Sequence, residues 1–253
     1  MTLTRRAAVQ AMAALGATPG ADAGAPAPGP TPRNVVVVGA HPDDPETGVG
    51  GTAKRLADLG HRVTFLYLTK GEAGIPGVAP LVAGRRREEE ALAACKVLGT
   101  TAVFAGQIDA ATHSDDAARQ DFRLKLESLH PDLVFAHWPL DIMRDHRVSA
   151  ELVLDIWSHR RGAFSLLFFE VLSGFQTQTF SPDVYVDITS VLEAKRLSVF
   201  AHASQDPGGQ WEHHQVMHRM RGLETLTAAA EAFVHHRASP TTDLLVGLAP
   251  RPR

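Results

Sequence analysis

The chain has 253 residues, 44% of them hydrophobic and 21% charged, which is ordinary for a globular protein. This length suits one sizeable α/β domain with a buried core. The formal net charge of −3 gives no electrostatic reason to expect a nucleic acid or an anionic membrane as partner. The single cysteine, Cys95, cannot form an internal disulfide, and it excludes a metal site built from several thiolates.

Residues 1–33 are expected to precede the folded domain, as an export signal and a proline-rich linker. Paired arginines, Arg5 and Arg6, stand before the weakly apolar stretch 11–17, and residues 21–23 offer a small-residue cleavage site. This pattern predicts export by the twin-arginine route, to the periplasm or outside the cell. The alternative is an alanine-rich terminus that is never cleaved. No membrane span is expected, because the apolar stretch is far shorter than the ~20 residues a span needs.

Residues 34–253 alternate predicted strands and helices, which is typical of a single doubly wound, mostly parallel, Rossmann-like α/β sheet flanked by helices. Strands are expected at residues 35–40, 62–69, 103–105, 132–136, 166–171 and 184–187. Helices are expected at residues 52–59, 85–98, 117–129, 148–159, 188–203 and 212–235, the last of them broken. Residues 70–84 contain four glycines and two prolines, and are predicted to form a loop long enough to act as a lid.

Polar side chains follow the first predicted strand at the point where it ends. Val35 to Val38 predict a strand buried on both faces, and His41, Asp43 and Asp44 come soon after it. In open α/β sheets, ligands bind at the carboxyl ends of the strands. His41 and Asp44 are ligand types that Zn²⁺ prefers, and Asp43 could be the base for a water that zinc activates. The residues alone leave open a Pro-Asp turn whose carboxylates cap the next helix.

The segment Ala40-His-Pro-Asp-Asp-Pro-Glu46 resembles the AHPDD-x-E signature of the PIG-L/LmbE-like family of zinc-dependent N-deacetylases. The resemblance extends over roughly residues 34–235. Further similar segments lie at family-like spacing, at residues 68–74, 87–90, 98–99, 145–147, 195 and 202–205. The resemblance implies a zinc-dependent hydrolase that removes an N-acetyl group from a small-molecule amino sugar or a glycoconjugate.

The chain contains thirteen histidines that could supply a third metal ligand, and His146 is the best candidate. It lies in the loop after the strand predicted at 132–136, which opens at the same edge of the sheet as His41 and Asp44. In the family, the histidine of the matching Asp-His segment completes a His-Asp-His set. Four other histidines occur as pairs on polar stretches and are expected at the surface: His213, His214, His235 and His236.

One position departs from the family pattern. Met143 stands where the family has a histidine that is implicated in stabilising the oxyanion and in protonating the leaving amine. A thioether donates no hydrogen bond, and the loss of one oxyanion donor typically lowers turnover about 10²–10³-fold. Arg144 is the candidate replacement cation, and His137 and His202 are the titratable candidates. Asp145, which lacks its usual histidine partner, is a candidate to orient the neighbouring ligand histidine.

Arg87 opens an R-x-x-E segment whose arginine binds substrate oxygens in the family. From the residues alone, the charge run 85–90 favours a solvated helix face, whereas the resemblance favours a substrate-binding Arg87.

The favoured function is an exported zinc-dependent N-deacetylase. The alternatives are a zinc amidase or esterase for another substrate, and a catalytically weakened relative that binds sugar. The sequence does not indicate an oligomeric state.

Overall fold

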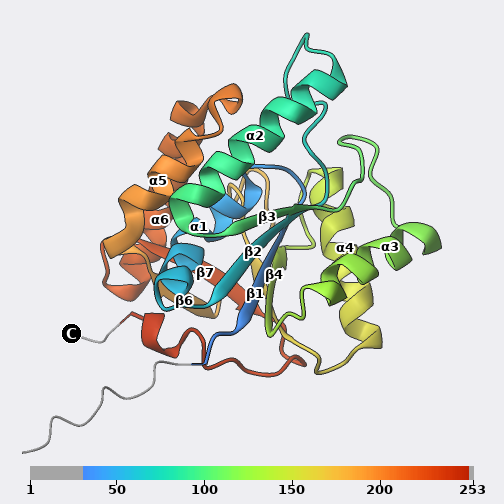
Figure 1. The fold of residues 1–253 in the computed structure, drawn as a ribbon. Coiled ribbons are helices and arrows are strands. Elements are labelled where there is room, and N and C mark those ends of the chain that lie inside the picture. The colour runs from blue at the N-terminus through green and yellow to red at the C-terminus, as the bar shows by residue number, and fades with distance from the viewer. Residues whose placement is uncertain (1–30, 251–253) are drawn as a thin grey trace, which may run out of the picture. The chain divides into compact units, whose positions relative to one another are not determined.

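A computed structural model describes residues 31–250 of the chain, so the predicted signal lies almost entirely outside the described residues. The described part contains a seven-stranded sheet between two layers of helices (Figure 1). Its order is β3-β2-β1-β4-β5-β7-β6, in which β1 to β5 are parallel while β7 runs antiparallel to β5 and β6. The prediction of a mostly parallel, helix-flanked sheet is confirmed. The strands are β1 (Asn34–Gly39), β2 (Arg62–Tyr67), β3 (Thr101–Phe104), β4 (Leu133–His137), β5 (Ser165–Phe169), β6 (Val184–Asp187) and β7 (Ala230–His235).

The central strand β1 has a hydrophobic core on each side. Because successive side chains of a strand point to opposite faces, Val35 and Val37 enter one core while Val36 and Val38 enter the other. Helices α1 (Asp44–Asp58) and α2 (Pro80–Leu98) pack in the first core, and α3 (Asp116–Ser128) and α4 (Arg144–His159) in the second. The remaining helices are α5 (Leu192–Phe200), α6 (Pro207–Thr225) and the short 3₁₀ helices η1 (Thr189–Val191), η2 (Ala203–Gln205) and η3 (Val246–Leu248).

Two helices begin earlier than predicted. Helix α1 begins at Asp44 instead of residue 52, and α2 begins at Pro80 instead of residue 85. Each has a proline in its first two positions, where the missing N–H would have no helical partner anyway. The glycines of α1 obscured it, since glycine disfavours helices. Packing explains one of them, because a Cβ on Gly48 would lie 2.4 Å from the Phe169 ring.

The prediction of a broken helix over residues 212–235 is wrong in its second half. Helix α6 ends at Thr225, Leu226 takes a left-handed conformation with φ of 60°, and β7 then follows. The alanine-rich start of β7 favours a helix by local propensity. Tertiary pairing overrides it, since β7 is bonded between β5 and β6, with Ala230 opposite Asp187.

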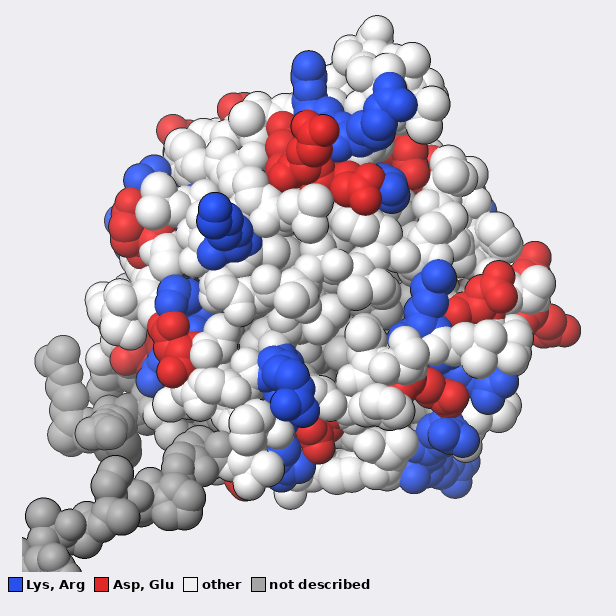
Figure 2. All heavy atoms as spheres, viewed as in Figure 1, with Lys and Arg blue, Asp and Glu red and all other residues white. Residues whose placement is uncertain are grey.

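The described part contains no helix suited to crossing a membrane, and the face drawn in Figure 2 carries charges of both signs. None of its helices combines the length and the hydropathy that a bilayer crossing requires. On the face shown in Figure 2, basic and acidic side chains are interspersed, and the two signs lie next to each other over α2. This mixed surface agrees with the small net charge of −3.

Candidate active site

The site lies where the strand order reverses. From β1 the chain proceeds to β2 and β3 on one side, while β4 and β5 lie on the other, so the carboxyl ends of β1 and β4 border a topological switch point. His41 lies in the turn after β1, and Asp44 begins α1. His146 lies in the first turn of α4, a few residues after β4. Two distant segments thereby supply side chains to one place.

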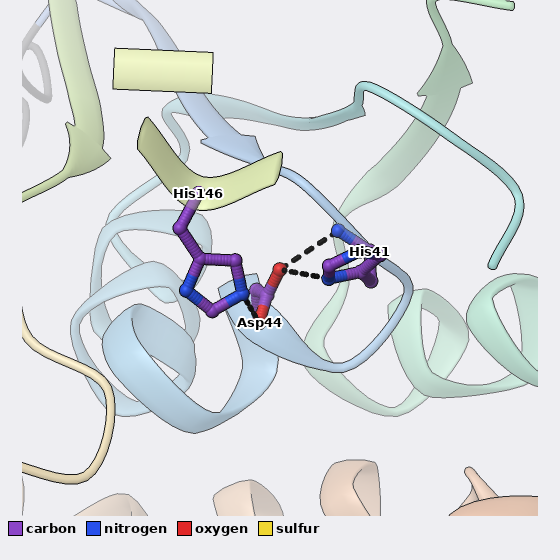
Figure 3. Close-up of side chains that lie close together, drawn as sticks. All are labelled: His41, Asp44 and His146. Atoms are coloured by element: carbon purple, nitrogen blue, oxygen red, sulfur yellow. Dashed lines mark hydrogen bonds and ion pairs between the residues drawn. The ribbon is translucent and has the colours of Figure 1, made fainter. Parts of the chain in front are cut away.

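The structure brings the three predicted metal ligands together. One ligand atom each from His41, Asp44 and His146 lies within 4.8 Å of the other two, and all three residues are buried. Figure 3 shows the Asp44 carboxylate between the two imidazoles. Asp44 Oδ2 lies 3.3 Å from His41 Nδ1, and Asp44 Oδ1 lies 3.3 Å from His146 Nε2.

These donors fit a divalent ion such as Zn²⁺. Two imidazoles and a carboxylate form a donor set typical of catalytic zinc sites. A buried carboxylate also needs compensating positive charge. Burial raises the pKa of Asp44, but His146 and His137 hold it well below its usual value. A second compact group adjoins the first, because Asp109 and Asp145 lie near His41 Nε2, at 3.2 and 3.3 Å.

Asp43 occupies the N-cap position of α1 but does not cap it. Its side chain makes no capping hydrogen bond, and its φ of 113° is unusual for a residue with a side chain. Such backbone conformations cluster at active sites. Its carboxylate instead accepts hydrogen bonds from Arg87 Nη2 at 3.0 Å and Gln210 Nε2 at 3.4 Å. Burial raises the pKa of Asp43, although Arg87 opposes that shift. The capping interpretation therefore fails for Asp43.

Arg87 is buried, unlike its neighbours in the charge run. The side chains of Arg85 and Arg86 are exposed, whereas Arg87 is only 3% exposed and reaches from α2 to the carbonyl of Pro42 and to Asp43. The interpretation of a solvated face is therefore wrong for Arg87. A pocket of about 390 Å³ opens above these groups, and its lining includes His41, Asp43, Asp44, His146 and Arg87. The candidate ligands and the candidate base thus share one accessible space.

Comparison with known proteins places this site in a family. The sequence model described as "PIG-L: GlcNAc-PI de-N-acetylase" matches residues 36–157, which include all five of these site residues. This match assigns residues 36–157 to the PIG-L family. A diacetylchitobiose deacetylase of Thermococcus kodakarensis is 28% identical over 195 residues, covering 71% of this chain and 73% of the relative.

Two further relatives extend the match. A probable N-acetyl-α-D-glucosaminyl L-malate deacetylase 2 of Bacillus anthracis is 27% identical over 186 residues, covering 68% of this chain and 81% of the relative. The crystal structure of conserved protein TT1542 from Thermus thermophilus is 27% identical, with a TM-score of 0.71. That match covers 83% of this chain and 97% of the Thermus chain, so the likeness reaches well beyond residues 36–157.

Two of the predicted proton donors lie beneath this PIG-L site. His137 is buried, its Nε2 accepts the Ala40 N–H at 3.0 Å, and the same atom lies 3.2 Å from Asp44. Burial lowers the pKa of His137 to about 4. His202 is also buried, with Nε2 3.1 Å from Glu46 Oε1. Both histidines lie outside the pocket lining, so neither is placed to contact a substrate in the pocket.

Arg144 and Asp145, the two residues after Met143, do not make the contacts predicted for them. The Arg144 side chain is exposed and donates to the carbonyls of Ala110 and Thr112, so it does not point into the pocket. Asp145 contacts His41, and it does not orient the adjacent His146 as expected. The carboxylate beside His146 is that of Asp141, whose Oδ2 lies 3.3 Å from Nδ1.

Several residues of this site were not predicted from the sequence. Asp109 and Asp141 come from loops that carry no local motif, so only the folded chain shows them beside His41 and His146. The prediction that His214 lies at the surface is wrong, because it is 2% exposed and lines the pocket. The sequence around His214 did contain a helical pattern that indicates burial. Four buried residues of α6 recur at the spacing of one helix face: Trp211, His214, His218 and Arg221.

Proposed function

We propose that this protein is a zinc-dependent hydrolase that removes the N-acetyl group of an amino sugar or glycoconjugate. The observation that carries the proposal is the meeting of His41, Asp44 and His146 next to Asp43 in an open pocket. The names of two relatives, a diacetylchitobiose deacetylase and a probable N-acetylglucosaminyl malate deacetylase, support N-acetylated amino sugars as the substrate class.

His41, Asp44 and His146 would hold the metal. When bound, a zinc ion supplies Lewis acidity, which polarises an acyl carbonyl and makes water more acidic. Asp43 would take one proton from the attacking water as oxygen adds to the carbonyl carbon. The same carboxyl would then return that proton to the nitrogen as the C–N bond breaks, releasing acetate and a free amine. A raised pKa of Asp43 suits both transfers.

Arg87 would have two tasks in this reaction. Its guanidinium holds the Asp43 carboxylate in place through the 3.0 Å hydrogen bond. Arg87 also lines the pocket, where guanidinium donors suit the oxygens of a sugar. Because the guanidinium is permanently charged, it can orient Asp43 and substrate but cannot transfer a proton.

Metal analysis combined with acetate release tests this proposal. The purified protein should contain about one zinc per chain and release acetate from members of a panel of N-acetylated amino sugars. Met143 favours a second candidate, a weakened relative that binds such sugars without turnover. Zinc with measurable sugar binding but no acetate release would support that candidate. Hydrolysis of other amides or of esters, without acetate release from N-acetylated sugars, would instead indicate a hydrolase for a different substrate.

We propose in addition that the protein is exported by the twin-arginine route. This rests on the sequence of residues 1–33 alone, with Arg5 and Arg6 before a short apolar stretch. N-terminal sequencing of the protein recovered from outside the cytoplasm checks it. Cleavage near residues 21–23 is the expected result, and an intact Met1 contradicts the proposal.

A further inference from the structure

The pocket needs a hydrogen-bond donor that Met143 cannot supply. Attack on an acetamido group moves negative charge onto the carbonyl oxygen, and a placed donor typically accelerates such a step about 10²–10³-fold. Met143 lines the pocket and is 41% exposed, but its thioether has no N–H or O–H. Arg144 points elsewhere, to the carbonyls of Ala110 and Thr112. Side chains with an N–H also line the pocket from other segments: Arg87, Gln176, Gln205, Gln210 and His214.

Helix α6 presents one face to this pocket. Gln210 and His214 are four residues apart, and therefore lie on the same side of the helix. Gln210 Nε2 lies 3.4 Å from Asp43 Oδ2, which fixes that side against the candidate base. His214 is one helical turn further along and lines the same pocket as Asp43 and His146. Helix α6 thus brings an imidazole to the site from outside the segments that carry the ligands.

His214 combines burial beside the pocket with a ring nitrogen that lacks a hydrogen-bond partner among the described residues. It is 2% exposed, and its Nδ1 is buried without a hydrogen-bond partner among residues 31–250. A buried polar group left unpaired costs about 1–3 kcal/mol, so a histidine here needs a reason beyond packing. The adjacent His213 differs, since it is exposed and bonded to the Gly209 carbonyl at 2.8 Å.

We propose that His214 is a further catalytic residue, which donates a hydrogen bond from its imidazole N–H to the acetamido oxygen as negative charge develops there. This inference rests on the proposed deacetylase function and deepens it. An imidazole retains at least one N–H in either protonation state, so the interaction does not require a charged histidine. A neutral histidine acts in this way in triosephosphate isomerase. His214 would therefore take over part of the work of the histidine that Met143 replaces.

Binding of a tetrahedral analogue tests this role separately from turnover. The probe is 2-deoxyglucose with a methylphosphonamidate in place of the acetamido group, and N-acetylglucosamine serves as the ground-state ligand. In the zinc-loaded protein, His214→Ala should weaken analogue binding by about 10²-fold. N-acetylglucosamine binding should change by less than about threefold, since the donor acts on developing charge. Calorimetric titration gives both affinities, and metal content and thermal unfolding establish that the variant is intact.

Three further variants sharpen the comparison. His214→Gln keeps an N–H donor and should recover part of the lost analogue affinity. Met143→His in the His214→Ala background restores the family donor and should do the same. His213→Ala removes an exposed neighbouring imidazole and should leave both affinities unchanged.

Two results would overturn the inference while leaving the proposed function in place. One is analogue binding by intact His214→Ala at the wild-type affinity. The other is an equal loss for the analogue and N-acetylglucosamine, which would indicate lost packing. A wild-type protein that releases no acetate and does not prefer the analogue contradicts the proposed function itself, and the inference falls with it.

Discussion

Asp43 and Asp44 are adjacent carboxylates in opposite electrostatic surroundings. Imidazoles surround Asp44, so its pKa is held well below the usual value despite burial. Burial raises the pKa of Asp43 instead. Neighbouring carboxyl groups whose pKa values are pushed apart commonly divide a reaction between them. Here the division would be metal binding by Asp44 and proton transfer by Asp43.

Paired amide substitutions should separate these two roles. Asp43→Asn removes the candidate base, and acetate release should fall by about 10²–10⁴-fold while zinc content stays near that of the wild type. Asp44→Asn weakens the ligand set, so both zinc content and acetate release should fall. Elemental analysis after exhaustive dialysis and an acetate assay measure the two effects. Retained activity in Asp43→Asn would remove this residue from the proton-transfer role.

The path of Arg87 into the site depends on glycine at position 74. A Cβ there would lie 2.3 Å from Arg87 Nη1, so Gly74→Ala should displace the guanidinium from Asp43. The clash involves the end of a long side chain, and we expect thermal stability to change little. The value of kcat/KM for acetate release should fall about 10–10²-fold, as for a misplaced catalytic group.

The control for this substitution is Gly247→Ala. Gly247 has open space where a Cβ would lie, so the variant should behave as the wild type. A Gly74→Ala protein with unchanged kcat/KM would show that the pocket does not need Arg87 in its present position. A large loss of thermal stability would instead indicate that the alanine disturbs the backbone.

Local sequence predicted the ligands because they are neighbours or follow adjacent strands. His41 and Asp44 share one turn, and His146 follows a parallel strand whose carboxyl end meets the same edge. Asp109 and Asp141 could not be predicted as site residues, because the local sequence does not indicate how their loops fold over the site. His214 was misjudged because a pair of histidines on a polar stretch was weighed ahead of the helical spacing from Trp211.

At the scale of elements, helix α1 is held in place by a buried ion pair. Glu231 of β7 accepts the N–H groups of Gly51 and Thr52, at 2.8 and 2.7 Å. Lys195 of α5 lies 2.5 Å from Glu231 Oε1 and donates to the Thr47 carbonyl at 2.6 Å. These contacts join α1, whose first residue is Asp44, to two later elements. The candidate metal ligand thus depends on the C-terminal part of the fold.

Breaking this pair should be strongly destabilising. Lys195→Met leaves Glu231 as a buried, uncompensated charge, so the free energy of unfolding should fall by about 3–5 kcal/mol. The double variant Lys195→Met with Glu231→Gln should recover part of that loss, because the orphan charge is gone. Lys54→Met removes the more exposed pair with Asp58 and should cost at most about 1 kcal/mol. Urea unfolding measures all three, and equal losses for Lys195→Met and Lys54→Met would contradict this account.

Element types were predicted well where pattern and propensity agree, as in β1 and β4. They were predicted poorly where packing overrides propensity. The glycines of α1 suggested a loop, but Gly48 lies against the Phe169 ring and belongs to the helix. The alanines of β7 suggested a helix, but pairing with β5 and β6 requires a strand. Both errors are tertiary effects that a local window of sequence does not contain.

For the whole molecule, buried histidines couple stability to pH. His218 of α6 is 4% exposed, and burial lowers its pKa well below 6.5, assisted by the positive charge of Lys195 and by His214. The folded state therefore binds fewer protons than the unfolded state below pH 6.5. The stability due to a neutral His218 is fully present above that pH and is lost as the pH falls. His146 has the opposite sign, since its pKa is raised to about 9 by Asp44 and Asp141 against the effect of burial.

A difference measurement isolates His218 from these other groups. Between pH 7.5 and 5.5, the zinc-loaded wild type should lose about 1.4 kcal/mol more stability than His218→Gln, since one unfolded-state proton enters the linkage. His41 and His146 are present in both proteins, so their contributions cancel to first order. The exposed His213→Gln should follow the wild type at both pH values. Urea unfolding at the two pH values gives the numbers, and an unchanged gap between wild type and His218→Gln would show that His218 takes up its proton equally in the folded and the unfolded protein.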